Sequence, residues 1–122
     1  MRMLLIFALA TAVAFPVLAH EPRPGPNGGR LVDAGDKMHV ELVANGAPEI
    51  SLYLFDANDQ PVPAAGFSGQ AILLIDGVTL RIPLEPVEAS RMAGNAAAPV
   101  PQGVKGAVQL KGPDGATAQA KF

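Results

Sequence analysis

The stretch QAILLIDGVTLRI, residues 70–82, decides the class of fold. Residues 70–75 form an almost continuous apolar run, which predicts a buried β-strand. Asp76-Gly77 follows and is typical of a two-residue hairpin turn, because such a turn needs positive φ at both positions. In residues 78–84 apolar and polar side chains then alternate, so the chain is expected to return as a second strand with one buried face.

The chain before this hairpin carries the same alternation. Residues 37–42 place apolar side chains on one face and polar ones, among them His39 and Glu41, on the other. This period of two predicts a half-buried strand. The Asn-Gly pair at 45–46 predicts a two-residue type I′ turn, and residues 50–55 alternate again as the next strand.

The chain after the hairpin predicts one more pair of strands. Residues 93–103 are small and rich in proline, which favours a loop or a short crossing segment. Residues 104–111 alternate as a strand, the Pro-Asp-Gly turn at 113–115 reverses the chain, and residues 116–122 return. Pro83 lacks an amide donor, so it favours an edge or bulge position of its strand.

The whole pattern predicts an all-β fold. No segment after the N-terminal region shows a helical apolar stripe of useful length. About six to eight short strands separated by turn signals are typical of an immunoglobulin-like β-sandwich, with a small closed barrel as the competing architecture. Cys and Trp are absent, which excludes the Cys–Trp–Cys core of a true immunoglobulin domain. We expect a single sandwich domain over residues 30–122.

The N-terminal region predicts export. Residues 1–19 combine a charge at Arg2 with a long apolar run that ends at Ala19, as in a cleaved secretory signal peptide. Cleavage after Ala19 would make His20 the first residue of a periplasmic protein, without membrane insertion. Residues 20–29 hold three Pro and three Gly, and are expected to form an extended lead segment.

Composition excludes several classes of function. The chain has 9 basic and 11 acidic residues, a formal net charge of −2, without any basic run, which argues against nucleic acid or anionic lipid as partner. Without Cys there is no disulfide framework and no thiolate ligand or nucleophile. Ser51, Ser68 and Ser90 lack a nucleophile-elbow context, and no phosphate-binding loop precedes a helix. We therefore expect a non-enzymatic protein.

A metal site is the hypothesis with a chemical mechanism. If His20 begins the mature chain, its amine and imidazole form a bidentate chelate, and His39 can add a second imidazole in a nitrogen-rich set suited to Cu(II). Glu41, Asp33 and Asp36 can add oxygen ligands or hydrogen bonds to the ligands. The alternative is that His39 is only a solvent-facing residue of its strand. Zn²⁺ suits the chain less well, because structural zinc prefers four ligands and thiolates are lacking.

One interpretation of the turn over residues 25–29 is structural: it lets the chain enter the first strand sharply. Its residues are Gly25, Pro26, Asn27, Gly28 and Gly29. The same residues are also the first part of a sequence that resembles a known family. The segments GPNGGRLVDAGD (25–36), HVELV (39–43), LFD (54–56) and QPV (60–62) resemble a family of small bacterial periplasmic proteins. They are similar also to the accessory N-terminal domain of heavy-metal efflux adaptors of the resistance-nodulation-division systems.

The resemblance covers nearly the whole mature chain for the single-domain proteins and roughly its first half for the adaptors. It implies a periplasmic location, a β-sandwich and the handling of copper or another divalent cation. A His-rich tract often precedes the glycine turn in the family, and here it is reduced to the single His20. The coiled-coil hairpin and barrel with which an adaptor bridges a pump are lacking, so the chain is not expected to perform efflux alone.

These observations predict a periplasmic, non-enzymatic accessory protein that binds Cu(II) or another divalent metal ion in metal homeostasis or efflux. Its partner would be a metal-efflux or other envelope protein. The alternative is a metal-independent interaction module of an envelope complex, which docks through a sheet edge or through its proline-rich lead segment.

Overall fold

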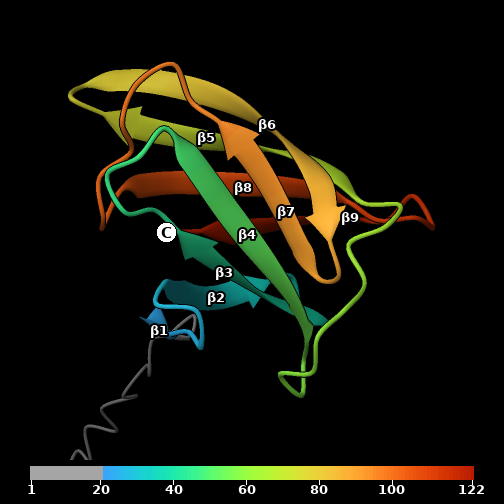
Figure 1. Ribbon diagram of the computed structural model, residues 1–122. Helices are drawn as coiled ribbons and strands as arrows, with labels where there is room; N and C mark the ends of the chain where they lie inside the picture. The colour runs from blue at the N-terminus through green and yellow to red at the C-terminus, as the bar shows by residue number, and fades with distance from the viewer. Residues whose placement is uncertain (1–20) are drawn as a thin grey trace, which may run out of the picture.

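The computed structural model describes residues 21–122 and shows an all-β protein with no helix in that range (Figure 1). Its strands are short and follow one another through tight turns. They are β1 (Arg23–Pro24), β2 (Arg30–Ala34), β3 (Met38–Val43), β4 (Glu49–Asp56), β5 (Ser68–Ile75), β6 (Val78–Glu88), β7 (Arg91–Asn95), β8 (Lys105–Lys111) and β9 (Thr117–Lys121).

The strands form one antiparallel sheet that closes into a barrel. Its order is β1-β2-β3-β4-β7-β6-β5-β8-β9, and β2 also pairs with β9 through Ala34 and Ala120. Closure makes an eight-stranded barrel from β2 to β9, with β1 added to the outer edge of β2. The predicted immunoglobulin-like sandwich is therefore wrong, and the sheet is not divided into two layers.

The physical reason for the single sheet lies in β6. Its first part, to Leu84, pairs with β5, and its second part, from Glu85 to Glu88, pairs with β7 across a register shift at Pro86. One bent strand thus joins the two halves that a sandwich would keep apart. Sandwich and barrel share the same alternation of inward and outward residues, so the alternation alone does not distinguish them.

Of the predictions for single hairpins and strands, some are confirmed and others are wrong. The hairpin over residues 70–82 is confirmed, and Asp76 and Gly77 have φ of 50° and 77°, as a type I′ turn requires. The two-residue turn at 45–46 is wrong, because β3 ends at Val43 and β4 begins only at Glu49. β7 was not predicted, because its RMAGN sequence has little β-propensity.

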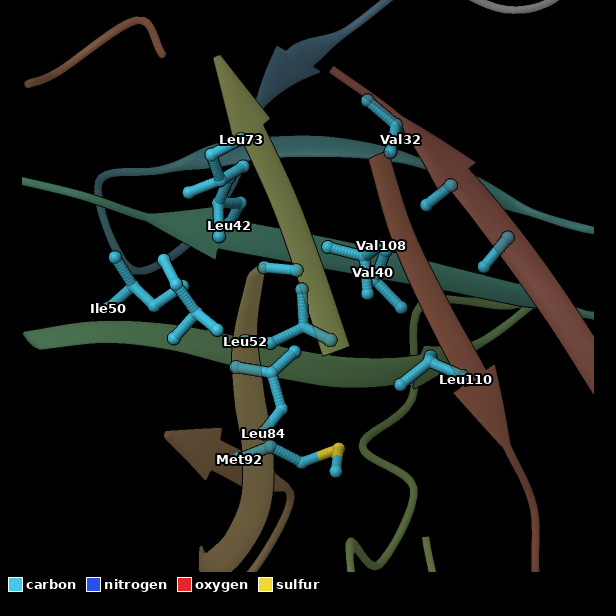
Figure 2. Packing of buried hydrophobic residues seen from close by; sticks show 14 of the residues in the cluster. Val32, Val40, Leu42, Ile50, Leu52, Leu73, Leu84, Met92, Val108 and Leu110 are labelled. Carbon is cyan, nitrogen blue, oxygen red and sulfur yellow. The ribbon is translucent and has the colours of Figure 1, made fainter. Parts of the chain in front are cut away.

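The barrel interior is filled by aliphatic side chains from all strands except β1 (Figure 2). Leu52, Leu73 and Val108 are fully buried and come from three strands, β4, β5 and β8. Residues 96–104 cross one end of the barrel and add Val100 and Val104 to this core. The interior is therefore a packed core rather than a channel. No helix among residues 21–122 is long and apolar enough to span a membrane.

Candidate functional site

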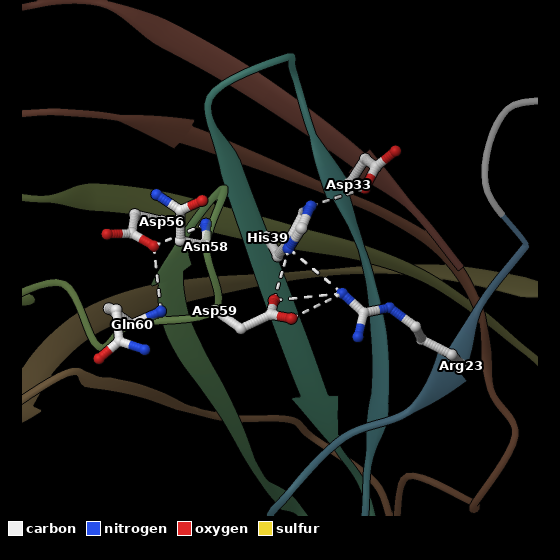
Figure 3. A network of polar contacts seen from close by, with 7 residues as sticks. All are labelled: Arg23, Asp33, His39, Asp56, Asn58, Asp59 and Gln60. Atoms are coloured by element: carbon white, nitrogen blue, oxygen red, sulfur yellow. Dashed lines mark hydrogen bonds and ion pairs between the residues drawn. The ribbon is translucent and has the colours of Figure 1, made fainter.

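A polar cluster on the outer surface of the barrel surrounds His39 (Figure 3). His39 lies on β3, directly opposite Asp33 of β2 in the antiparallel register. Asp59 approaches from the turn after β4, and Arg23 comes from β1. Four segments of the chain therefore meet at one imidazole.

Each ring nitrogen of His39 faces a carboxylate. Nδ1 lies 2.7 Å from Asp59 Oδ1, and Nε2 lies 3.1 Å from Asp33 Oδ1. An ionised carboxylate can only accept a hydrogen bond, so the contact with Asp59 requires a proton on Nδ1. On the other side, Asp33 Oδ1 is placed to accept a hydrogen bond from Nε2 when that nitrogen carries a proton, or to bind a cation together with it. The imidazole carries 18% of its maximal exposure and remains accessible from solvent.

Arg23 completes the cluster through Asp59. Its guanidinium donates to both Asp59 oxygens at 3.1 and 3.2 Å. It also lies 3.3 Å from His39 Nδ1, but both groups are donors to the same carboxylate, so this contact is not a hydrogen bond. Hydrogen bonds from His39 and then from Arg23 hold the pKa of the Asp59 carboxyl below its ordinary value.

The turn that carries Asp59 is held by its own side chains. Asp56 Oδ1 accepts from the backbone N–H groups of Asn58 and Gln60 at 2.8 and 3.0 Å. This local Asx arrangement lets Asp59 adopt a φ of 61°, which directs its carboxylate toward β3 (Figure 3). Asp59 was not among the predicted ligands, because residues 56–61 are rich in turn formers and no local pattern relates them to His39. Arg23 was not predicted either, because the lead segment shows no pattern that places it near His39.

Glu41 lies on the same strand as His39, two residues further on, but it faces a different set of partners. Its carboxylate is fully buried and accepts three hydrogen bonds of 2.8 Å, from Asn27 N, Asn27 Nδ2 and Gly29 N. A side chain at Gly25 would collide with it. The turn over residues 25–29 is thus folded around this carboxylate, and Glu41 has no oxygen directed toward His39.

The other predicted ligands are placed less favourably. Asp36 lies in the exposed turn between β2 and β3 and makes no polar contact with the cluster. His20 lies outside the described residues. Within residues 21–122 no three His, Cys, Asp or Glu side chains converge to hold a metal ion. The two carboxylates at His39 lie at opposite nitrogens, so only Asp33 can share a cation with Nε2.

Comparison with protein-family models, with curated proteins and with solved structures finds no match for this chain. The resemblance to periplasmic metal-handling proteins therefore remains a prediction.

Proposed function

We propose that the protein is a periplasmic, non-enzymatic metal-binding protein that holds Cu(II) or another divalent cation at His39 Nε2. The observation that carries this proposal is the contact between His39 Nδ1 and Asp59. A histidine that binds a metal commonly donates its other ring N–H to a carboxylate, which fixes the tautomer and orients the ring. Asp59, itself held by Arg23, is suited to that task.

The position of Asp33 supports an oxygen ligand beside the imidazole. Metal–nitrogen and metal–oxygen bonds of about 2.0–2.2 Å place two adjacent ligands roughly 3 Å apart. Asp33 Oδ1 lies 3.1 Å from His39 Nε2, which is compatible with a metal ion bound between them. Because protons and the metal compete for the same ligand atoms, binding is expected to weaken as the pH falls.

The lead segment can supply the remaining ligands. Arg23 lies opposite Leu31 in the antiparallel pair of β1 and β2, so the chain N-terminal to Arg23 heads along β2 toward Asp33. His20, the expected first residue of the mature chain, is the proposed source of an amine and a second imidazole. Two imidazoles, an amine and a carboxylate make a set suited to Cu(II).

The direct test is titration of the mature protein with Cu(II), its N-terminus verified by intact mass, followed by calorimetry and by electron paramagnetic resonance. We expect one bound Cu(II) with nitrogen ligands, and a large loss of affinity in His39→Ala. Asp59→Asn should weaken binding without removing it, since it disturbs only the orientation of the ring. Asp36→Asn is the matched control, because Asp36 is an exposed neighbour outside the cluster.

A second comparison locates the N-terminal ligands. One extra residue ahead of His20 should weaken Cu(II) binding strongly if the free amine is a ligand. Native protein that binds no more Cu(II) than His39→Ala would contradict the proposal, and a metal-independent interaction module would then describe the protein better. A role in metal homeostasis or efflux, in contact with an envelope partner, is supported by the sequence resemblance alone.

A further inference from the structure

A cavity, which we call the end cavity, lies at one end of the barrel between residues 34–38, 62–67 and 110–118. The opposite end, at the start of β8, is crossed by residues 96–104. The volume of the end cavity is about 690 Å³, and small-molecule sites commonly have volumes of about 300–1,000 Å³. Because β-barrels often bind small molecules at their mouths, the end cavity has the position and the size of a ligand site.

The end cavity is formed because β2 and β9 pair at a single position. Ala34 lies opposite Ala120, and the chain then turns at Gly35, whose φ is 66°, instead of continuing along β9. The loop that precedes β5 borders the resulting space. A side chain at Gly66 of this loop would come within 2.8 Å of Pro113 Cβ, so the loop and the β8–β9 turn are in contact. In Figure 1 both lie at the right side of the barrel.

The lining of the end cavity is mostly apolar. Ala34 and Leu110 belong to the buried core, and Met38, Val62 and Phe67 are half-buried and pack against it. Twelve of the sixteen lining residues are apolar or glycine. A hollow of about 760 Å³ on the outer face of β5, β8 and β9 differs, since six of its ten lining residues are polar. The end cavity is therefore the one suited to an apolar ligand.

The charged groups of the end cavity favour a ligand with a positive charge. Asp36 lies in the β2–β3 turn and Asp114 lies in the β8–β9 turn, so carboxylates border the cavity on two sides. Lys37 is the single basic residue of the lining. The ring of Phe67 adds an aromatic face, which attracts cations.

The edge of β9 adds a backbone acceptor. Gly112 N–H donates to Ala116 C=O at 2.8 Å, and bonded and non-bonded pairs alternate along an antiparallel ladder. The next pair, Lys111 and Thr117, is therefore non-bonded. The N–H and C=O groups of Thr117 point away from β8 toward the β2–β3 turn, and no backbone group of residues 21–122 pairs with them. The Thr117 carbonyl is thus available to a ligand in the cavity.

We propose that the end cavity binds a small apolar molecule that carries one ammonium group. Its apolar body packs against Met38, Val62 and Phe67, which removes apolar surface on both sides from water. The ammonium group donates to Thr117 C=O and lies near the two rim carboxylates. The cavity contains no residue of the His39 cluster, so this proposal can fail without affecting the metal proposal, and the reverse.

The experiment is an NMR titration of the metal-free mature protein with two probes, 2-(2-naphthyl)ethylamine and 2-naphthylacetate, which share a ring system and carry opposite charges. We expect the amine to cause saturable shifts at residues 34–38, 62–67 and 110–118. Its dissociation constant should be about 1 mM or lower, as for other ligands of this size. The carboxylate should bind at least roughly threefold more weakly because of the rim charges.

Ala118→Leu places a larger side chain in the cavity and should raise the dissociation constant of the amine at least roughly tenfold. Gln119→Leu is the matched control, since it adds the same side chain at the next, outward-facing position of β9 and should bind as the native chain does. Ala65→Trp is a second variant, at an exposed lining residue, and should also weaken binding.

The double variant Asp36→Asn, Asp114→Asn tests the charge. It retains an oxygen at residue 114 for the backbone N–H of Ala116, and it should bring the affinities of the two probes together. Circular dichroism and thermal unfolding verify that each variant is folded. The proposal is overturned if neither probe causes saturable shifts, or if binding survives both Ala118→Leu and Ala65→Trp. Binding of the carboxylate as tightly as the amine by the native chain would also overturn it.

Discussion

Removal of the Glu41 carboxylate, which is buried under the turn over residues 25–29, should be among the most damaging single changes on the outer face of this barrel. In Glu41→Ala three donors lose their acceptor, namely Asn27 N, Asn27 Nδ2 and Gly29 N. Each hydrogen bond to a charged group contributes about 1.5 kcal/mol or more, which for three bonds would give a loss of about 4.5 kcal/mol. The donors regain water when the turn lifts off β3, so we expect the free energy of unfolding to fall by about 3 kcal/mol.

Glu41→Gln tests whether the hydrogen bonds or the charge matter more. The amide oxygen can replace Oε2 and keep the two backbone donors, Asn27 N and Gly29 N. The amide nitrogen then faces the side chain of Asn27, whose amide can rotate to present its oxygen. All three hydrogen bonds survive without the charge, so the loss should be only about 1 kcal/mol.

Urea unfolding measures both values, and hydrogen exchange of residues 25–30 reports whether the turn has lifted. In Glu41→Ala we expect rapid exchange of these amides, while β5 and β8 keep their protection. The reasoning is refuted if Glu41→Ala costs less than about 0.5 kcal/mol, or if Glu41→Gln is as damaging as Glu41→Ala. Either result would mean that the carboxylate does not hold the turn.

Three further predictions concern other parts of the chain. Leu52→Ala should lower the free energy of unfolding by about 3 kcal/mol in urea titrations, since Leu52 is fully buried and leaves a cavity, while an effect below about 1 kcal/mol would contradict the packed core. Gly77→Ala should cost about 1 kcal/mol by the same assay, because φ at Gly77 is 77°. The pKa of Asp59 is lowered in the folded protein, so its contribution to stability is fully present above the unfolded value of about 3.9 and is lost as the pH falls through the folded value. The difference in unfolding midpoint between native protein and Asp59→Asn should therefore shrink below about pH 4, and a difference that persists there would refute this assignment.

The parts of the fold that local patterns predict are those that depend on neighbours in the sequence. The hairpin of β5 and β6 follows from its alternation and from Asp76-Gly77, and both were recognisable. β7 was not, because its middle is Ala93-Gly94, and Gly94 is needed where β6 leaves no room for a side chain next to Pro83. Closure of the barrel was not predictable either. It depends on the pairing of β2 with β9, which are far apart in sequence and pair through two alanines.

In the candidate site, too, local patterns predicted some features, whereas contacts between distant segments were not predictable. The alternation of β3 correctly separated Met38, Val40 and Leu42 from His39 and Glu41, since the first three pack in or against the core. It also predicted that Glu41 would face water, which is wrong, because the turn at 25–29 folds over it. Asp59 reaches His39 from twenty residues away, and such a contact leaves no periodic signal in the sequence.

His39 and Glu41, the two polar residues of β3, therefore have different roles. This difference allows a test of whether the lead segment takes part in the proposed metal site. Glu41 holds the turn that precedes β2, and that turn leads β1 and Arg23 back toward Asp59 and His39. If ligands at the N-terminus complete the site, Glu41→Ala must weaken Cu(II) binding as well as stability, although Glu41 is not a ligand. If His39 and Asp33 bind the metal without the lead segment, Glu41→Ala should leave the affinity unchanged. Measured beside His39→Ala, this variant separates the contribution of the lead segment from that of the imidazole.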